Sequence, residues 1–225
     1  MIDVDMPAVA ILITIYDGDD RSTGCLEECQ KQVDAIAAEG KYSFSIFINN
    51  EGEKGYNALW SKAVAEGFDF YIWMDYSLRL SEGALASLLE NSGFLRHKAV
   101  FAGTVAGDNK ELLFGGRNRR GKIIEPDPTI PVPCHLYDLS LTLVPSHAVS
   151  SLENPSDIIH SSLLEYGFGS KVAKAGIARV VAPGVLASTS RKVDIPVWKN
   201  PDKPLGDRIL SFMKRLLNNT KILII

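Results

Sequence analysis

The chain has 225 residues, of which 46% are hydrophobic and 23% are charged, and its formal net charge at pH 7 is −3. This length and composition can bury a sizeable core and fit one α/β domain better than two. The charge excludes the broad basic field that binding to a nucleic-acid backbone requires, so we expect no nucleic-acid partner.

The cysteines and the N-terminal sequence both indicate a cytoplasmic protein. The three cysteines are odd in number, and the nearest two, Cys25 and Cys29, are separated by three residues rather than two. We therefore do not expect these cysteines to form a disulfide or to bind a metal ion, which fits a reducing compartment. The first sixteen residues carry acids where a signal peptide has basic residues, and their apolar run has the length of a strand.

Strands and helices alternate in the first third of the chain. The apolar run 9–16 is typical of a buried parallel strand, and Thr23 is a candidate N-cap for the helix that follows the next turn. A second strand is expected over 42–48 and a helix over 56–66. The run FDFYIWMD then predicts a third strand that ends at Asp75.

The rest of the chain continues the pattern. Ser81 is predicted to cap a helix that precedes a short strand, AVFAG. Four prolines between Lys122 and Cys134 exclude a helix or an interior strand there. Strand LSLTLVP, a helix from Ser146, a helix over 165–175 and strand IARVVAPG complete the chain. The order predicts an α/β fold with a mostly parallel central sheet and helices on both faces.

Two aspartates stand at the ends of predicted strands: Asp17 follows the first and Asp75 closes the third. Ligands of such sheets bind outside the carboxyl ends of the strands. An acid at this place can hold a divalent cation that grips a diphosphate, because Mg²⁺ and Mn²⁺ prefer oxygen ligands. The alternative is that Asp75 starts a turn, where aspartate is favoured for local hydrogen bonding. Both interpretations of Asp75 stay open at this point.

The segment LLFGGRNRRG places Arg117, Arg119 and Arg120 in one loop. Arginine pairs bidentately with phosphate, so Arg117 and its neighbours could steady a donor diphosphate or an anionic acceptor. A solvated hairpin turn explains the same residues equally well.

Three aromatic residues, Trp60, Tyr71 and Trp73, could form a platform for a sugar. Two of them lie inside a predicted strand, so we expect all three in the core.

A basic amphipathic helix is predicted near the C-terminus. From Asp207 onward, apolar residues recur on one helical stripe and Arg208, Lys214 and Arg215 fall on the other face. Such a helix can lie in a membrane interface or dock on its own domain. We therefore divide the chain into a domain over 1–204 and a helix and tail over 205–225.

Several segments together resemble the family-2 glycosyltransferases. VAILITIYDGDDRSTGCLEECQKQ is similar to their opening strand and helix, and YIWMDYS is similar to their metal-binding strand end. The family's strand and helix before the acceptor site are similar to LTLVPSHAVSS. The segment with the catalytic base is similar to LLEYGFGSKVAKAG, and the strand that follows it is similar to VVAPGV. The resemblance covers roughly residues 8–192 in the family's order.

The resemblance implies a single GT-A (Rossmann-like) domain that transfers a sugar from a nucleoside diphosphate sugar with inversion. It implies that Asp17, Asn49 and Asn50 contact the nucleotide and that Asp75 reaches Mn²⁺ or Mg²⁺. Glu165 matches the general base that deprotonates the acceptor hydroxyl.

The chain departs from the family pattern at the metal strand. The family has Asp-x-Asp or Asn-Asp-Asp there, whereas this chain reads Asp75, Tyr76, Ser77, so one carboxylate is missing. The aspartate usual after the second strand is also absent, and the second acid of the base motif is Gly167. Weaker metal affinity follows, although Mg²⁺ often relies on one or two carboxylates plus phosphate.

These observations support two functions. The first is a cytoplasmic, hexosyltransferase-like enzyme of polysaccharide biosynthesis. Its substrates would be a UDP-type donor and a saccharide or lipid-linked acceptor. It would also contact the inner face of the membrane or associate with itself. The second is a degenerate GT-A domain that acts as a binding or partner subunit. A nucleotidyltransferase fits less well, because no Gly-rich phosphate loop with Lys or Arg follows the first strand.

Overall fold

The structure is a computed structural model that describes residues 6–15, 22–49, 52–150, 171–190 and 204–220. The chain divides into two compact units, Met1–Ser190 and Arg191–Ile225, and each is described by itself. The first unit contains the sheet, and the second contains one described helix.

As far as residue 94 the first unit follows the alternation of strands and helices that its sequence predicts, apart from one short extra strand, and six strands then come before the helix at Ser146. The helices that the structure describes in full in this unit are α1 (Ser22–Ala38), α2 (Gly52–Glu66), α3 (Ala84–Phe94) and α4 (Ser146–Ser150). Its longer strands are β1 (Ala8–Thr14), β2 (Ser43–Asn49), β3 (Phe70–Asp75), β5 (Ala99–Ala106), β10 (Leu141–Pro145) and β11 (Ala178–Ser188). Its short strands are β4 (Arg79–Leu80), β6 (Leu112–Phe114), β7 (Gly116–Arg117), β8 (Val132–Pro133) and β9 (Leu136–Tyr137).

The central sheet has the strand order β2-β1-β3-β10-β5-β11-β4, with β6 on β5 and β8 on β11. Strands β2, β1 and β3 are mutually parallel, as are β5 and β11, and β10 is antiparallel to both β3 and β5. Five long strands therefore run in one direction and end at one edge of the sheet. This confirms the predicted α/β fold with a mostly parallel sheet.

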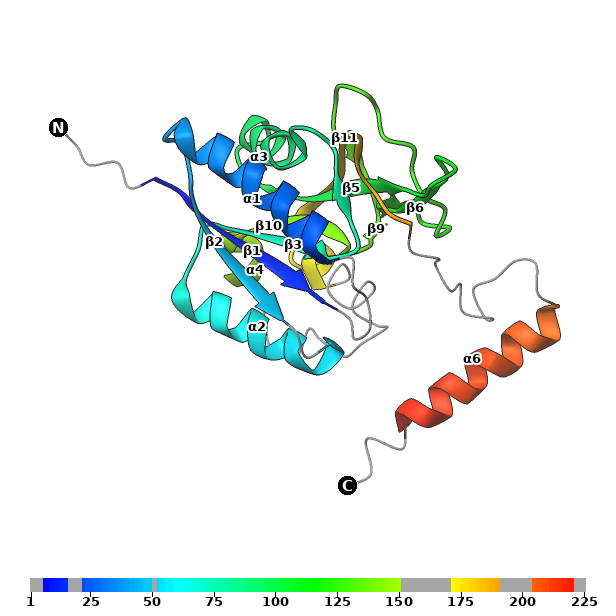
Figure 1. Ribbon diagram of the computed structural model, residues 1–225. Helices are drawn as coiled ribbons and strands as arrows, with labels where there is room; N and C mark the ends of the chain where they lie inside the picture. The colour runs from blue at the N-terminus through cyan, green and yellow to red at the C-terminus, as the bar shows by residue number, and fades with distance from the viewer. Residues whose placement is uncertain (1–5, 16–21, 50–51, 151–170, 191–203, 221–225) are drawn as a thin grey trace. The chain divides into compact units, whose positions relative to one another are not determined.

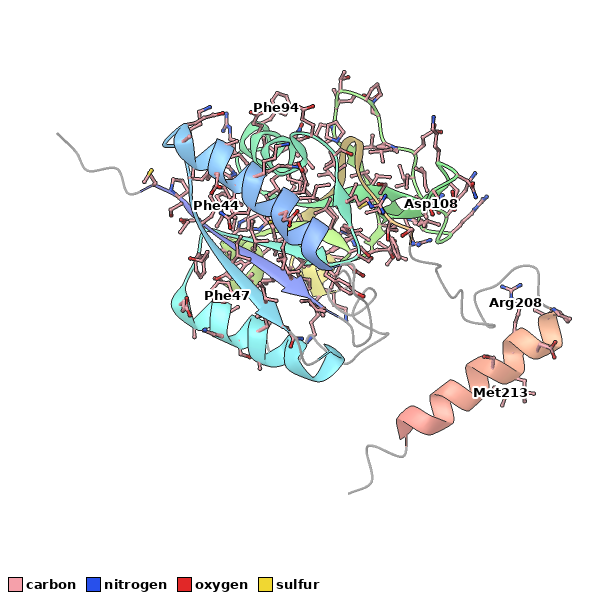
Figure 2. The ribbon with its side chains drawn as sticks, viewed as in Figure 1. Phe44, Phe47, Phe94, Asp108, Arg208 and Met213 are labelled. Carbon is pink, nitrogen blue, oxygen red and sulfur yellow. The ribbon has the colours of Figure 1, made fainter. Side chains whose placement is uncertain are left out.

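Helices cover both faces of this sheet (Figure 1). On one face, α1 and α3 pack on alternate strand residues such as Ile11 and Ile72. On the other face, α2 and α4 pack on the intervening residues, among them Leu12. Figure 2 shows this alternation on β2, where Phe44 and Phe47 lie on opposite faces.

The aromatic residues Trp60, Tyr71 and Trp73 belong to the core under α2. All three are buried, and the Trp60 ring lies edge-on to the rings of Tyr71 and Trp73, with centroids 5.1 and 4.9 Å away. This confirms the expectation that they are core residues and not a sugar platform.

Two helix starts differ from the prediction. Helix α3 has Gly83 as its N-cap, in a left-handed conformation, and the N–H of Leu85 in its first turn donates to the side-chain oxygen of Gln32 on α1 at 3.1 Å. The prediction for Ser81 was wrong, because its hydroxyl donates to the carbonyl of Val185 on β11 instead. Helix α1 begins at Ser22, so Thr23 lies inside its first turn and does not precede it.

The proline-rich segment contributes only the two-residue strand β8, which pairs with β11. It forms neither a helix nor an interior strand, as predicted. The second unit contains α6 (Leu205–Thr220). Among the described residues, no helix is both long and apolar enough to cross a membrane.

Candidate functional site

The carboxyl ends of β2, β1 and β3 bring three polar residues together. Thr14 is in register with Asn49 on one side and with Asp75 on the other. Residues in register on parallel strands point to the same face of a sheet, and Trp73, two residues before Asp75, packs under α2. Asn49, Thr14 and Asp75 therefore point to the α2 side. Since adjacent strands are spaced by about 5 Å, Asn49 and Asp75 lie roughly 10 Å apart.

Asp75 is half-buried and closes a turn at the end of β3. Its Oδ1 accepts a hydrogen bond from the backbone N–H of Ser77 at 2.9 Å, and its own N–H donates to the carbonyl of Ser140 at 2.8 Å. The turn interpretation from the sequence is therefore correct for this residue. It does not compete with the ligand interpretation, because the residue is only half-buried.

Two hydroxyls lie beside this turn, and sequence reasoning missed them. The chain after Asp75 crosses the edge of the sheet and pairs with β11 through β4. There the hydroxyls of Ser77 and Thr189 are 3.2 Å apart, and the Thr189 hydroxyl lies 3.1 Å from the Ser77 carbonyl oxygen, which accepts from it. Thr189 could have been found from its position in the sequence, because it directly follows β11, which ends at the same edge of the sheet as β3.

The donor set fits a cation that is held mainly through phosphate. Among the residues that the structure describes, no group of three or more His, Cys, Asp or Glu side chains could hold a metal ion. Tyr76, next to the aspartate, is buried in the core under α1. Asp75 and the Ser77 hydroxyl remain as hard oxygen donors, and Mg²⁺ commonly binds one or two carboxylates plus substrate phosphates.

The thiol nearest this edge is not a nucleophile. The Cys25 thiol lies 3.9 Å from the carbonyl oxygen of Asp75, and burial raises its pKa from 9.0 to about 12. Burial raises the pKa of Cys29 to about 12 as well. Both thiols are protonated at neutral pH, and the thiolate is the reactive form.

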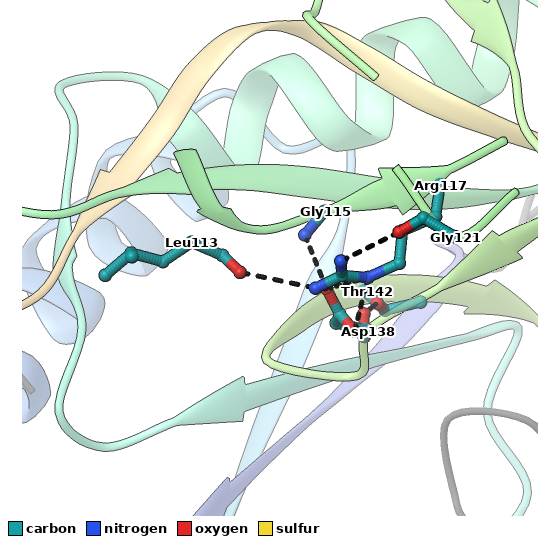
Figure 3. Close-up of polar contacts among 6 residues, drawn as sticks. All are labelled: Leu113, Gly115, Arg117, Gly121, Asp138 and Thr142. Carbon is teal, nitrogen blue, oxygen red and sulfur yellow. Dashed lines mark hydrogen bonds and ion pairs between the residues drawn. The ribbon is translucent and has the colours of Figure 1, made fainter. Parts of the chain in front are cut away.

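Arg117 has a protein partner, the carboxylate of Asp138 (Figure 3). Its guanidinium donates to the carboxylate of Asp138 from Nη2 at 3.0 Å and from Nε at 3.3 Å. Its Nη1 donates to the carbonyl of Gly121 at 3.2 Å. Every guanidinium nitrogen thus meets a protein acceptor, so contact with a donor diphosphate stays a prediction for this residue.

The basic loop after Arg117 is a hairpin. The N–H of Asn118 donates to the carbonyl of Lys122, and the side-chain oxygen of Asn118 accepts from the N–H groups of Arg120 and Lys122. This is the hairpin alternative that the sequence left open. Arg119 is exposed and donates to Nε2 of His135 at 2.8 Å.

The ion pair predicts a stability effect. Asp138 is 2% exposed, and it accepts from the N–H of Gly115 as well as from Arg117. We expect Asp138→Asn to lower the free energy of unfolding by about 2 kcal/mol, since charge-assisted hydrogen bonds of a buried group are lost. Urea denaturation measures this free energy, with the exposed Arg119→Gln as the control variant. Equal stability of the two variants would contradict the prediction.

Three predicted site residues, Asp17, Asn50 and Glu165, lie outside the residues that the structure describes. In the sequence, Asn50 directly follows β2 and Asp17 follows β1 by three residues. Glu165 precedes a helical stretch over 171–174. Their roles remain predictions.

Comparisons with known proteins were made for sequence and for structure. No protein family matches the chain, and no curated protein matches its sequence. Solved structures do match. A197 from STIV superposes with a TM-score of 0.52 at 10% identity, over 80% of this chain and 84% of that one.

Two glycosyltransferases also match at low identity. The structure of GalNAc-T7 with UDP, GalNAc and Mn²⁺ gives a TM-score of 0.55 at 11% identity, over 94% of this chain and 48% of that one. The structure of S. aureus TarS 1–349 with UDP-GlcNAc gives 0.54 at 10% identity, over 84% of this chain and 60% of that one. The chain thus spans about half to three fifths of the length of these two proteins, and the likeness establishes a GT-A-like fold.

Proposed function

We propose that this protein is a glycosyltransferase that moves a sugar from a nucleoside diphosphate sugar, UDP-type, to a saccharide or lipid-linked acceptor. The observation that carries the proposal is the alignment of Asn49, Thr14 and Asp75 at the carboxyl edge of a GT-A-like sheet. Ligands of open α/β sheets bind at this edge. The likeness to proteins solved with UDP and with UDP-GlcNAc supports the choice of donor.

In this proposal each residue has one task. Asn49, with Asn50 and Asp17, binds the nucleoside, and Asp75 orients the diphosphate. Mg²⁺ or Mn²⁺ bound by Asp75 would offset the negative charge of the diphosphate.

Glu165 accepts the proton of the acceptor hydroxyl while that oxygen bonds to the anomeric carbon. The bond from that carbon to the diphosphate oxygen breaks at the same time, and the nucleoside diphosphate leaves with the electron pair. One displacement inverts the anomeric carbon.

The second candidate is a degenerate GT-A domain that binds a nucleotide or a partner without catalysis. One observation favours it: the residue after Asp75 is the buried Tyr76, and the next offers only the Ser77 hydroxyl. Less negative charge then faces a cation than in the family pattern. The two candidates agree on nucleotide binding and differ on turnover.

A thermal-shift screen tests donor binding. A ligand that binds only the folded state stabilises it by about 2.7 kcal/mol at a hundred times its Kd, which for a chain of this size raises the melting temperature by roughly 5–10 °C. We expect this rise with UDP or a UDP-sugar plus Mn²⁺, and a smaller rise with Mn²⁺ alone. A panel of nucleoside diphosphates and their sugars that leaves the melting temperature unchanged would contradict the proposal.

A further inference from the structure

The charge of the chain is divided between its two units. Residues 191–225 carry eight basic and three acidic residues, a net charge of +5, whereas residues 1–190 carry 16 basic and 24 acidic residues, a net charge of −8. The two values add to the −3 of the whole chain. A segment that is basic in an otherwise acidic protein indicates an anionic partner for that segment.

Helix α6 also exposes apolar side chains in a row. Leu205, Ile209 and Met213 follow one another at intervals of four residues, so they lie on one side of the helix. They are 69%, 52% and 54% exposed, and Leu210 beside them is 54% exposed. We call these four residues the α6 apolar stripe. Exposed apolar residues in such a row mark a surface for another partner.

Basic residues flank the stripe. By helical position, Arg208 and Arg215 fall along one border of the stripe, and Lys214 falls beyond the other. In Figure 2 the side chains of Arg208 and Met213 leave the helix on different sides. In an interfacial helix, the apolar stripe enters the boundary between the lipid headgroups and the acyl chains. Cationic side chains beside the stripe can then reach the lipid phosphates.

We propose that α6 binds the surface of an anionic lipid bilayer and lies in the plane of the interface. The helix has 16 residues, which is short of the roughly 20 that cross a bilayer, so it lies on the membrane and does not span it. A second copy of the chain is disfavoured as the partner, because the two segments of net charge +5 would repel each other. The proposal does not depend on the glycosyltransferase activity.

Vesicle co-sedimentation of the full chain tests the proposal. We expect binding to vesicles that contain phosphatidylserine, little binding to vesicles of phosphatidylcholine alone, and a loss of binding as salt is raised. Ile209→Gln with Met213→Gln should weaken binding at least about tenfold, because two side chains no longer enter the apolar boundary. Ser211→Gln, off the stripe, is the matched control and should bind like wild type.

The charge is tested separately from the stripe. Arg208→Gln, Lys214→Gln and Arg215→Gln should each weaken binding to phosphatidylserine vesicles by roughly fivefold. The proposal is overturned by equal binding of the stripe variant and the control, or by equal binding to both kinds of vesicle.

Two further outcomes would also overturn it. If the stripe variant melts several degrees lower than Ser211→Gln without lipid, α6 docks on its own protein. If wild type doubles its mass in light scattering and the stripe variant does not, the stripe pairs two copies. Nucleotide binding is measured on the same samples and tests the proposed glycosyltransferase function. Its result does not depend on whether α6 binds membranes.

Discussion

Replacing Glu165 with glutamine should lower the turnover of sugar transfer by roughly 10²-fold or more and leave the affinity for the sugar donor near that of wild type. Glutamine has nearly the shape of glutamate but cannot accept the acceptor proton at neutral pH. The lost interaction is one that is made only in the transition state of sugar transfer. The loss of activity should therefore appear in kcat and kcat/KM together. Donor affinity by calorimetry and turnover by product formation, measured on the same preparations, check this.

The matched control for Glu165 is Asp157→Asn, which removes an acid from the same segment of the chain. It should turn over like wild type. Undiminished turnover of Glu165→Gln would remove this residue from the mechanism. A wild-type protein that binds UDP-sugars and transfers no sugar to any of a broad acceptor panel would favour the degenerate domain.

Replacing Asp75 with asparagine should abolish the metal-dependent part of nucleotide binding and leave the fold intact. The amide oxygen of asparagine can still accept from the N–H of Ser77, so the turn that closes β3 survives. The negative charge that would hold Mg²⁺ or Mn²⁺ is lost. Titration of UDP in the presence of Mn²⁺ should therefore give a much weaker Kd for the variant, while its melting temperature without ligand stays close to that of wild type.

A control for Asp75 is Asp34→Asn, which neutralises an exposed acid on α1 and leaves the edge of the sheet unchanged. It should bind UDP and Mn²⁺ like wild type. Identical UDP affinities of Asp75→Asn and wild type, with Mn²⁺ present, would show that Asp75 is not the metal ligand.

Much of the sheet could be predicted because its strands are continuous apolar runs. The runs that became β1, β3 and β5 are buried on both faces, and this pattern predicts central strands. The direction of β10 could not be predicted. Its five residues are all buried, so its apolar pattern is the same whether it pairs parallel or antiparallel.

The candidate site was predictable only where it follows from strand ends. Asn49 and Asp75 each end a strand, so their shared edge follows from the parallel order. The contact of Ser77 with Thr189 joins residues 112 positions apart, and the pairing of Arg117 on β7 with Asp138, directly after β9, joins residues 21 positions apart. Such contacts depend on how the chain crosses the edge, which local periodicity does not encode.

The central claim, a diphosphate-binding edge at Asp75, is tested most directly by the anomalous scattering of Mn²⁺ in a crystal of the protein with UDP. We predict a Mn²⁺ peak about 2 Å from an oxygen of the Asp75 carboxylate, the distance of an oxygen ligand to a small hard cation, with the diphosphate bound to the same ion. UDP bound at the hairpin of Arg119 and Arg120, with no Mn²⁺ peak near Asp75, would contradict the claim.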